Sequence, residues 1–257
     1  MKKGVQYMVV IFNTSLKGGV GKTTYNAVMA TYLAEKGLKT LVIDLDPQAN
    51  LTTMLGMKSS PKSYLNGINQ RDLREVIQPI RENLDIIVGH ESISELPNVL
   101  TLLKQQEKAT YLDKFLEPIK ADYDYILIDS VPSRSLLLVN VLAMTDYVYA
   151  LFEASPFGVK SLEDLSNYIS VTRNKYDLDV MFLGVIQYGY NKNSRNMNKI
   201  VESLEPAMRE AMLENVIYKR ERASVWANGI TLDSYHDKNC YDMFKVTIDE
   251  QLDHINE

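Results

Sequence analysis

A glycine-rich loop near the start of the chain restricts its fold more than any other feature of the sequence. Residues 17–24 read KGGVGKTT, directly after an apolar, β-branched run at 5–13 and directly before a segment whose apolar positions recur at helical spacing. Glycines allow backbone N–H groups to turn inward around phosphate oxygens, and the N-terminus of the following helix adds the positive end of its dipole. The order of strand, glycine loop and helix therefore predicts a phosphate-binding loop at one end of a sheet.

Apolar runs alternate with helical segments along the rest of the chain, which predicts an α/β fold with a mostly parallel, twisted sheet covered by helices on both faces. No linker divides the sequence, so we expect a single domain over 1–257. The expected strands lie at 5–13, 38–44, 84–88, 123–129, 146–152 and 180–187. The expected helices lie at 23–37, 98–119, 156–176, 194–214 and 240–256, and the segment 45–83 is expected to be irregular.

Composition excludes several classes of protein. The single cysteine, Cys240, excludes an internal disulfide, a multi-cysteine zinc site and an iron–sulfur cluster held by two cysteines from each chain of a dimer. No run approaches the roughly 18 apolar residues of a membrane span, and the N-terminus lacks a signal-peptide core, so we expect a cytoplasmic protein. The formal charge of −5 means that any contact with nucleic acid must come from a local basic patch.

Two side chains of the loop have the chemistry of nucleotide binding. Lys22 is expected to place a positive charge at the β- and γ-phosphates of a nucleotide, and Thr23 is expected to offer its hydroxyl to Mg²⁺. The ordinary pattern G-x-x-x-x-G-K-[ST] requires glycine at position 16, where this chain has Leu16, and an additional lysine opens the loop instead. The predicted nucleotide-binding residues are Lys17, Gly18, Gly19, Val20, Gly21, Lys22, Thr23 and Thr24.

Three carboxylates follow predicted strands. Asp44 and Asp46 come after LVI, and Asp129 comes after YILI. Ligands of open parallel sheets bind beyond the carboxyl ends of the strands, so we expect these carboxylates near the phosphate loop. Asp129 is the candidate to hold Mg²⁺ directly or through water, the alternative being a cap of the next helix. Asp44 has either a direct role at the metal or a supporting one.

The motifs together resemble those of a known family. KGGVGKTT is similar to the deviant Walker A motif of the ParA/MinD ATPases, and the likeness to ParA/Soj-type partition ATPases extends over most of the chain. DLDPQAN at 44–50 resembles their switch I, YDYILIDSVPS at 123–133 resembles their Walker B and switch II, and ENVIYKRERAS at 214–224 resembles their late strand and basic turn. The chain departs from the family at Val131, where proline is usual, and at Leu16, where a polar residue is frequent.

The resemblance implies a P-loop ATPase that uses ATP and Mg²⁺ and hydrolyses ATP slowly without its partner. It assigns catalytic roles to Lys17, Lys22 and Asp46. Lys17 would reach across a homodimer that sandwiches two ATP molecules, its alternative being a solvated loop lysine. Asp46 would orient the attacking water, its alternative being a structural turn beside Pro47.

The resemblance also implies an ATP-bound homodimer that binds DNA without sequence preference, associates with the nucleoid and is released when a ParB-like centromere-binding partner stimulates hydrolysis. The first strand is expected to begin near residue 5, so we expect no N-terminal helix-turn-helix domain. Residues 191–222 contain seven basic against five acidic side chains. The candidate DNA contacts are Lys192, Arg195, Lys199, Lys219, Arg220 and Arg222.

Three alternatives stay open beside DNA partition. The same kind of ATPase could position a protein complex or a membrane-associated cargo through another adaptor protein. A structural protein with a relic loop would show no ATP turnover, and a bacterial tyrosine kinase would carry a larger C-terminal tyrosine cluster than Tyr235 and Tyr241. The acidic segment 241–257 predicts a helix packed on the domain and no membrane binding. Trp226 belongs either to the core or to a dimer interface.

Overall fold

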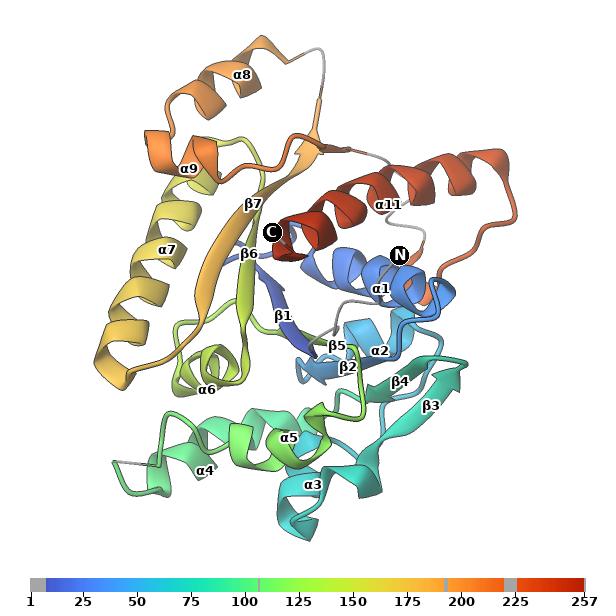
Figure 1. Ribbon diagram of the computed structural model, residues 1–257, viewed down its shortest axis with the longest axis vertical. Helices are drawn as coiled ribbons and strands as arrows, with labels where there is room; N and C mark the ends of the chain where they lie inside the picture. The colour runs from blue at the N-terminus through green and yellow to red at the C-terminus, as the bar shows by residue number, and fades with distance from the viewer. Residues whose placement is uncertain (1–7, 106, 192–193, 220–225, 257) are drawn as a thin grey trace.

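An eight-stranded sheet forms the centre of the computed structural model, which describes residues 8–105, 107–191, 194–219 and 226–256 (Figure 1). The strand order is β3-β4-β2-β5-β1-β6-β7-β8, and within the described residues only the β3–β4 pairing is antiparallel. The expected α/β fold with a mostly parallel sheet is therefore confirmed. The strands are β1 (Val9–Thr14), β2 (Thr40–Leu45), β3 (Gln78–Arg81), β4 (Leu84–Ile87), β5 (Tyr125–Ser130), β6 (Tyr147–Phe152), β7 (Met181–Tyr190) and β8 (Ile217–Tyr218).

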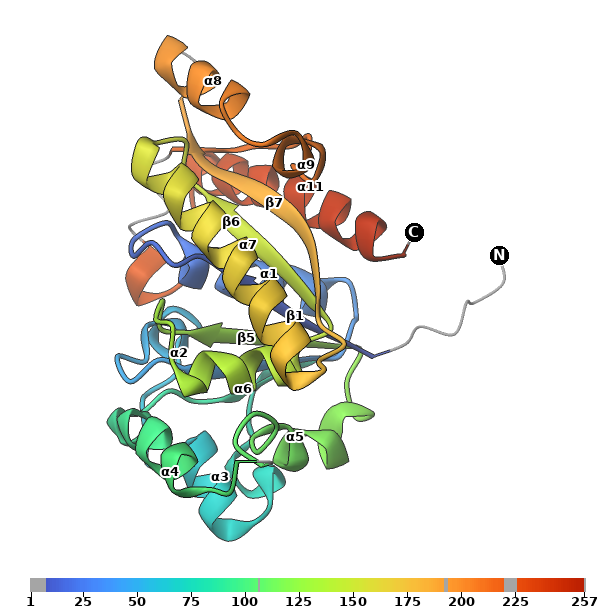
Figure 2. The same cartoon turned by 90° about the vertical axis from the view of Figure 1, so that its left-hand side faces the viewer.

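Helices bury both faces of the sheet, because successive residues of a strand point to opposite sides. In β1, Val10 and Phe12 belong to one core layer and Ile11 to the other. The layer containing Ile11 is covered by α1 (Lys22–Glu35), α2 (Asn50–Met54) and α11 (Tyr235–Asn256). The other is covered by α3 (Tyr64–Gln70), α4 (Leu96–Leu102), α5 (Asp113–Lys120), α6 (Leu136–Met144) and α7 (Pro156–Tyr176), of which α6 and α7 lie in front of the strands in Figure 2.

Two long predicted helices are each divided in two. The segment expected as one helix at 98–119 forms α4 and α5, and the chain between them is held by Asn140 of α6, which accepts from the Leu112 backbone N–H and donates to the Lys108 carbonyl. The segment expected at 194–214 forms α8 (Arg195–Glu202) and α9 (Pro206–Glu210). Pro206 begins the second helix because proline lacks the N–H that a continuous helix would need there.

The segment expected to be irregular contains short elements. Residues 45–83 include α2, α3, the 3₁₀ turn η1 (Leu73–Val76) and β3, and further 3₁₀ turns lie at η2 (Glu91–Glu95) and η3 (Trp226–Asn228). These elements are too short to show a helical or strand pattern of apolar residues, so they cannot be recognised from sequence. The predicted strand at 5–13 begins outside the described residues, and β1 starts at Val9.

The C-terminal helix α11 packs on the domain, as its amphipathic pattern predicts. Its apolar side chains Phe244, Ile248 and Leu252 are buried in the same layer as α1. Trp226 is 0% exposed and its ring lies 6.1 Å from that of Phe244, which places it in the core. None of the helices in the described part of the chain is both long and apolar enough to cross a membrane.

Candidate nucleotide-binding site

Three neighbouring strands bring the predicted site residues to one end of the sheet. β1 lies between β5 and β6, and β5 lies between β1 and β2, so the carboxyl ends of β1, β2 and β5 are adjacent. In the parallel register Asp44 pairs with Asp129. The phosphate loop leaves the same end of β1. The edge that the sequence predicted for ligand binding therefore gathers the loop and the carboxylates.

Glycine is required at two points of the loop. Gly19 and Gly21 have φ angles of 74° and 93°, in the left-handed region that side chains rarely adopt. Gly21 also precedes α1, and a Cβ added there would lie 2.3 Å from the ring of Tyr188 on β7. Tyr188 thus packs directly on the phosphate loop, a contact that no local sequence pattern indicates.

Lys22, Thr23 and Asp129 form the polar floor of the site. Lys22 is only 8% exposed, and burial lowers the pKa of its ammonium while the charges of Asp129 and Asp46 raise it. The Thr23 hydroxyl donates to Asp129 Oδ2 at 2.8 Å, and Asn26 Nδ2 donates to Oδ1 at 3.2 Å. Burial raises the pKa of Asp129 to about 6, against the opposing effects of Thr23, Lys22 and Asn26.

An open pocket of about 390 Å³ lies over the loop. Asp46 also lines it, and its Oδ1 accepts from the Gln48 backbone N–H at 2.9 Å. The side chain therefore takes part in a turn, and its Oδ2 is not used in that bond. The loop residues Gly18, Gly19, Gly21, Lys22, Thr23 and Thr24 form the remainder of the predicted lining, and Asn50, Met54, Pro132 and Ala227 add side chains that were not predicted.

Asp44 forms its hydrogen bonds with α2 and with the backbone of Asp46. It is 0% exposed, and Oδ2 accepts from the backbone N–H and the hydroxyl of Thr52 at 2.9 and 2.7 Å, while Oδ1 accepts from the Asp46 backbone N–H at 3.1 Å. These bonds tie the segment after β2 to α2. Of the two roles left open for Asp44, the geometry favours the supporting one.

The buried Asp44 leads to a test by pH. Burial and the charge of Asp129 raise the pKa of Asp44 to about 7, so the folded state retains a proton that an unfolded aspartate, with a pKa near 3.9, has already lost. The folded protein therefore loses stability as pH rises through this window, by about 2–3 kcal/mol between about pH 5 and about pH 8. Asp44→Asn does not titrate, so the difference in Tm, variant minus wild type, should increase as pH rises. A difference independent of pH, measured by thermal unfolding without nucleotide, would show that Asp44 has an ordinary pKa.

Lys17 is held at the edge of the site. Its ammonium forms an ion pair with Glu153, which follows β6, and lies 3.4 Å from the Ser155 hydroxyl at the start of α7. The Lys17 side chain is 29% exposed, so it remains accessible from outside the fold.

The candidate DNA contacts are only partly described. Lys192, Arg220 and Arg222 lie outside the described residues, and Arg195 opens α8 without a described side chain. Lys199 and Lys219 are exposed and lie around Tyr190, which donates to Asn198 and whose carbonyl accepts from the Lys219 N–H. The two described lysines therefore share one end of the molecule, near α8 (Figure 1).

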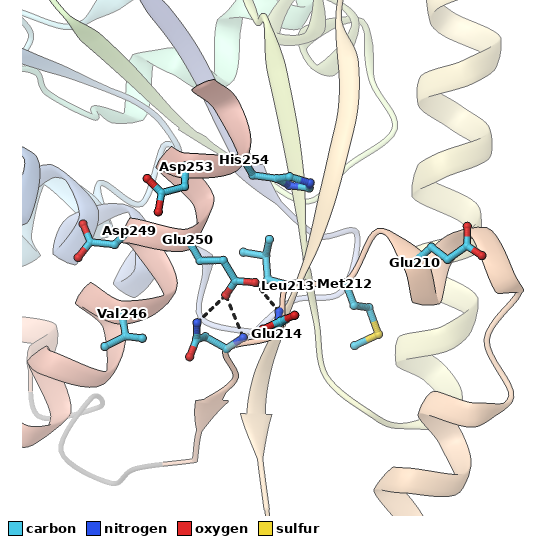
Figure 3. Close-up of a pocket in the computed structure, with 10 residues that line it drawn as sticks. Glu210, Met212, Leu213, Glu214, Val246, Asp249, Glu250, Asp253 and His254 are labelled. Carbon is cyan, nitrogen blue, oxygen red and sulfur yellow. Dashed lines mark hydrogen bonds between the residues drawn. The ribbon is translucent and has the colours of Figure 1, made fainter. Parts of the chain in front are cut away.

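A second pocket lies between α11 and residues 210–215 and does not suit a nucleotide (Figure 3). It encloses about 560 Å³, and Glu250 within it accepts from the backbone N–H groups of Glu214 and Asn215. Its carboxylates would repel phosphate groups. They come from Glu210, Glu214, Asp249, Glu250 and Asp253.

Comparisons with known proteins agree with the geometry. A family model described as an AAA domain matches residues 8–182. The sporulation initiation inhibitor protein Soj of Bacillus subtilis is 29% identical over 84% of this chain and 86% of its own length. The virulence plasmid ParA family protein of Chlamydia psittaci is 31% identical over 71% of this chain and 70% of its own length. A putative plasmid partition protein of Borrelia burgdorferi, solved with AMPPNP, superposes with a TM-score of 0.75 at 28% identity, covering 94% of this chain and 98% of that one.

Proposed function

The chain belongs to the ParA family and is an ATPase of the kind that positions cargo, and from this premise we propose that its cargo is plasmid or chromosomal DNA. In this proposal an ATP-bound homodimer in the cytoplasm binds the DNA of the nucleoid without sequence preference. A ParB-type partner then stimulates hydrolysis and releases the dimer.

The contact between Thr23 and Asp129 beside the phosphate loop carries the enzymatic part of this proposal. A hydroxyl and a carboxylate are hard oxygen ligands of the kind that Mg²⁺ takes together with nucleotide phosphates, and here they lie 2.8 Å apart. Mg²⁺ supplies charge neutralisation at the phosphates when it is bound. The residues present fit that group, with Lys22 adding a second positive charge at the phosphates.

Two other residues complete the proposed chemistry. Asp46 orients a water molecule for attack on the γ-phosphate, since it lines the pocket and retains an oxygen free of its turn hydrogen bond. Lys17 neutralises developing charge at the nucleotide of the second protomer. Phosphoryl transfer depends mainly on such positioning and charge stabilisation.

Binding to an arbitrary DNA duplex tests the proposal. Fluorescence anisotropy is measured with ATP, with ADP and without nucleotide, over a series of salt concentrations. We expect binding with ATP alone, weakening steeply as salt rises because contacts to phosphates release counterions. Absence of binding in every state, in a protein that still forms ATP-dependent dimers, would refute DNA as the cargo and favour a protein-cargo adaptor.

The two described lysines near Tyr190 give a sharper prediction. The double variant Lys199→Glu/Lys219→Glu should lose DNA affinity, and the slope of log affinity against log salt should become shallower by about 0.9 for each contact removed. The matched control is Lys62→Glu/Lys104→Glu, the same charge change on exposed lysines beside α3 and α4, at the opposite end of the molecule (Figure 1). Equal losses in the two variants would mean that net charge alone, and not this surface, governs binding.

A further inference from the structure

A chain of buried hydrogen bonds connects the C-terminal helix to Asp129. The Tyr25 hydroxyl donates to Gln251 Oε1 at 2.7 Å, and Gln251 Nε2 donates to Asn13 Oδ1 at 2.8 Å. Asn13 Nδ2 then donates to Asn26 Oδ1 at 3.0 Å, and Asn26 Nδ2 donates to Asp129 Oδ1 at 3.2 Å. The residues come from α1, β1, β5 and α11, and none of their side chains is more than 1% exposed.

The direction of donation along this series of hydrogen bonds is fixed at Asp129. An ionised carboxylate only accepts hydrogen bonds, so Asn26 must present its NH₂ group to Asp129. Its oxygen then faces Asn13, which must also present NH₂, and the same requirement passes to Gln251. The phenol of Tyr25 closes the sequence because burial raises its pKa and keeps it a neutral donor.

All five residues of this hydrogen-bond series are buried, so water has no open path by which to replace a missing hydrogen-bond partner. A buried amide that loses its partner is left desolvated without a hydrogen bond, which destabilises that arrangement. Reversing one amide would place two oxygens against each other. The orientation of each amide therefore depends on the next, and the dependence ends at a helix that contributes no side chain to the nucleotide pocket.

We propose that Gln251 is a positioning residue for the metal site. Through Asn13 and Asn26, it holds the Asp129 carboxylate in the orientation that binds Mg²⁺ with nucleotide. The C-terminal helix α11 thereby sets metal affinity from outside the pocket. This inference rests on the proposed role of Asp129 as the carboxylate that holds Mg²⁺.

The test measures how much Mg²⁺ strengthens nucleotide binding. The affinity for a fluorescent ADP analogue is determined with Mg²⁺ and with a chelator, and the ratio of the two affinities is the Mg²⁺ enhancement. Removal of a hydrogen-bond partner behind a metal ligand typically reduces metal affinity 10- to 100-fold. We expect Gln251→Leu to reduce the enhancement about tenfold, at the lower end of that range because the effect passes through two amides.

Two further variants separate positioning from packing. Gln251→Glu retains the size of the side chain and an acceptor for Tyr25. Once its carboxyl is ionised it cannot donate to Asn13, so at alkaline pH it should reduce the enhancement as Gln251→Leu does. Thr247→Val is the matched control, since Thr247 lies one turn earlier on α11 and is equally buried, and among the described residues its hydroxyl bonds only to the Met243 carbonyl. It should lower Tm and leave the enhancement unchanged.

The outcomes distinguish this inference from the proposed function. Asp129→Ala should abolish the enhancement, and if it does not, the assignment of Asp129 as the metal carboxylate is wrong. If Asp129→Ala abolishes the enhancement while Gln251→Leu and Gln251→Glu retain it, the proposed role of Gln251 is refuted and the assignment of Asp129 stands. Thermal unfolding without nucleotide shows whether each variant folds. If Gln251→Leu does not fold, Gln251→Glu provides the test of the Mg²⁺ enhancement.

Discussion

Replacement of Lys17 by alanine should abolish ATP-dependent dimerisation and reduce ATP hydrolysis by a large factor. A cation supplied to a phosphoryl-transfer site from a second protein contributes about 10³–10⁵ in rate in related systems. In the structure this lysine forms an ion pair with Glu153 at the edge of the pocket, and that pair must separate before Lys17 can reach a second protomer. Size-exclusion chromatography with light scattering, with ATP and with ADP, measures dimerisation, and phosphate release measures hydrolysis.

Stability provides the control for this variant. Both members of the Lys17–Glu153 pair are partly exposed, and such pairs contribute about 0–1 kcal/mol, so Lys17→Ala should keep nearly the wild-type Tm. Lys36→Ala is the matched substitution, because Lys36 forms a similarly exposed pair with Asp249 on α11, and it should dimerise normally. Normal hydrolysis and dimerisation by Lys17→Ala would refute the role of this lysine at a partner's nucleotide.

Replacement of Asp46 by alanine should stop hydrolysis while ATP binding and dimerisation remain. A positioned group that assists proton transfer typically contributes about 10²–10⁴ in rate. Binding should persist because Lys22, Thr23 and the backbone of the phosphate loop are unchanged. Single-turnover hydrolysis and the affinity for ATP, measured separately, give the two quantities.

The alternative role of Asp46 in a turn has a distinct signature. Its carboxylate accepts a hydrogen bond from the Gln48 backbone N–H, and an asparagine oxygen can accept the same bond. Asp46→Asn should therefore fold like the wild type, but its ATP hydrolysis should remain as slow as that of Asp46→Ala. Recovery of wild-type hydrolysis in Asp46→Asn, with loss in Asp46→Ala, would show that the turn and not the orientation of water explains this residue.

Local sequence patterns predicted those elements whose start and end are set by neighbouring residues in the chain. The phosphate loop is eight consecutive residues between a predicted strand and a predicted helix, and in the structure β1 precedes the loop and α1 begins at Lys22. The predicted helix at 156–176 coincides with α7, where Ser155 caps the first turn and Pro156 opens it. The break within 98–119 was missed because it depends on Asn140, a residue of the next helix.

The sequence by itself determined the parallel sheet, the phosphate loop and the carboxylates at the ends of strands, because each is specified by neighbours along the chain. The tertiary structure alone decided that Trp226 belongs to the core, that Lys17 pairs with Glu153 and that Gln251 donates to Asn13, 238 residues earlier in the sequence. Nothing in the local sequence marks such pairs, since a buried amide is recognised only by the group that it faces. Burial and hydrogen bonding between distant segments are properties of the packed chain, and these properties connect α11 to the nucleotide site.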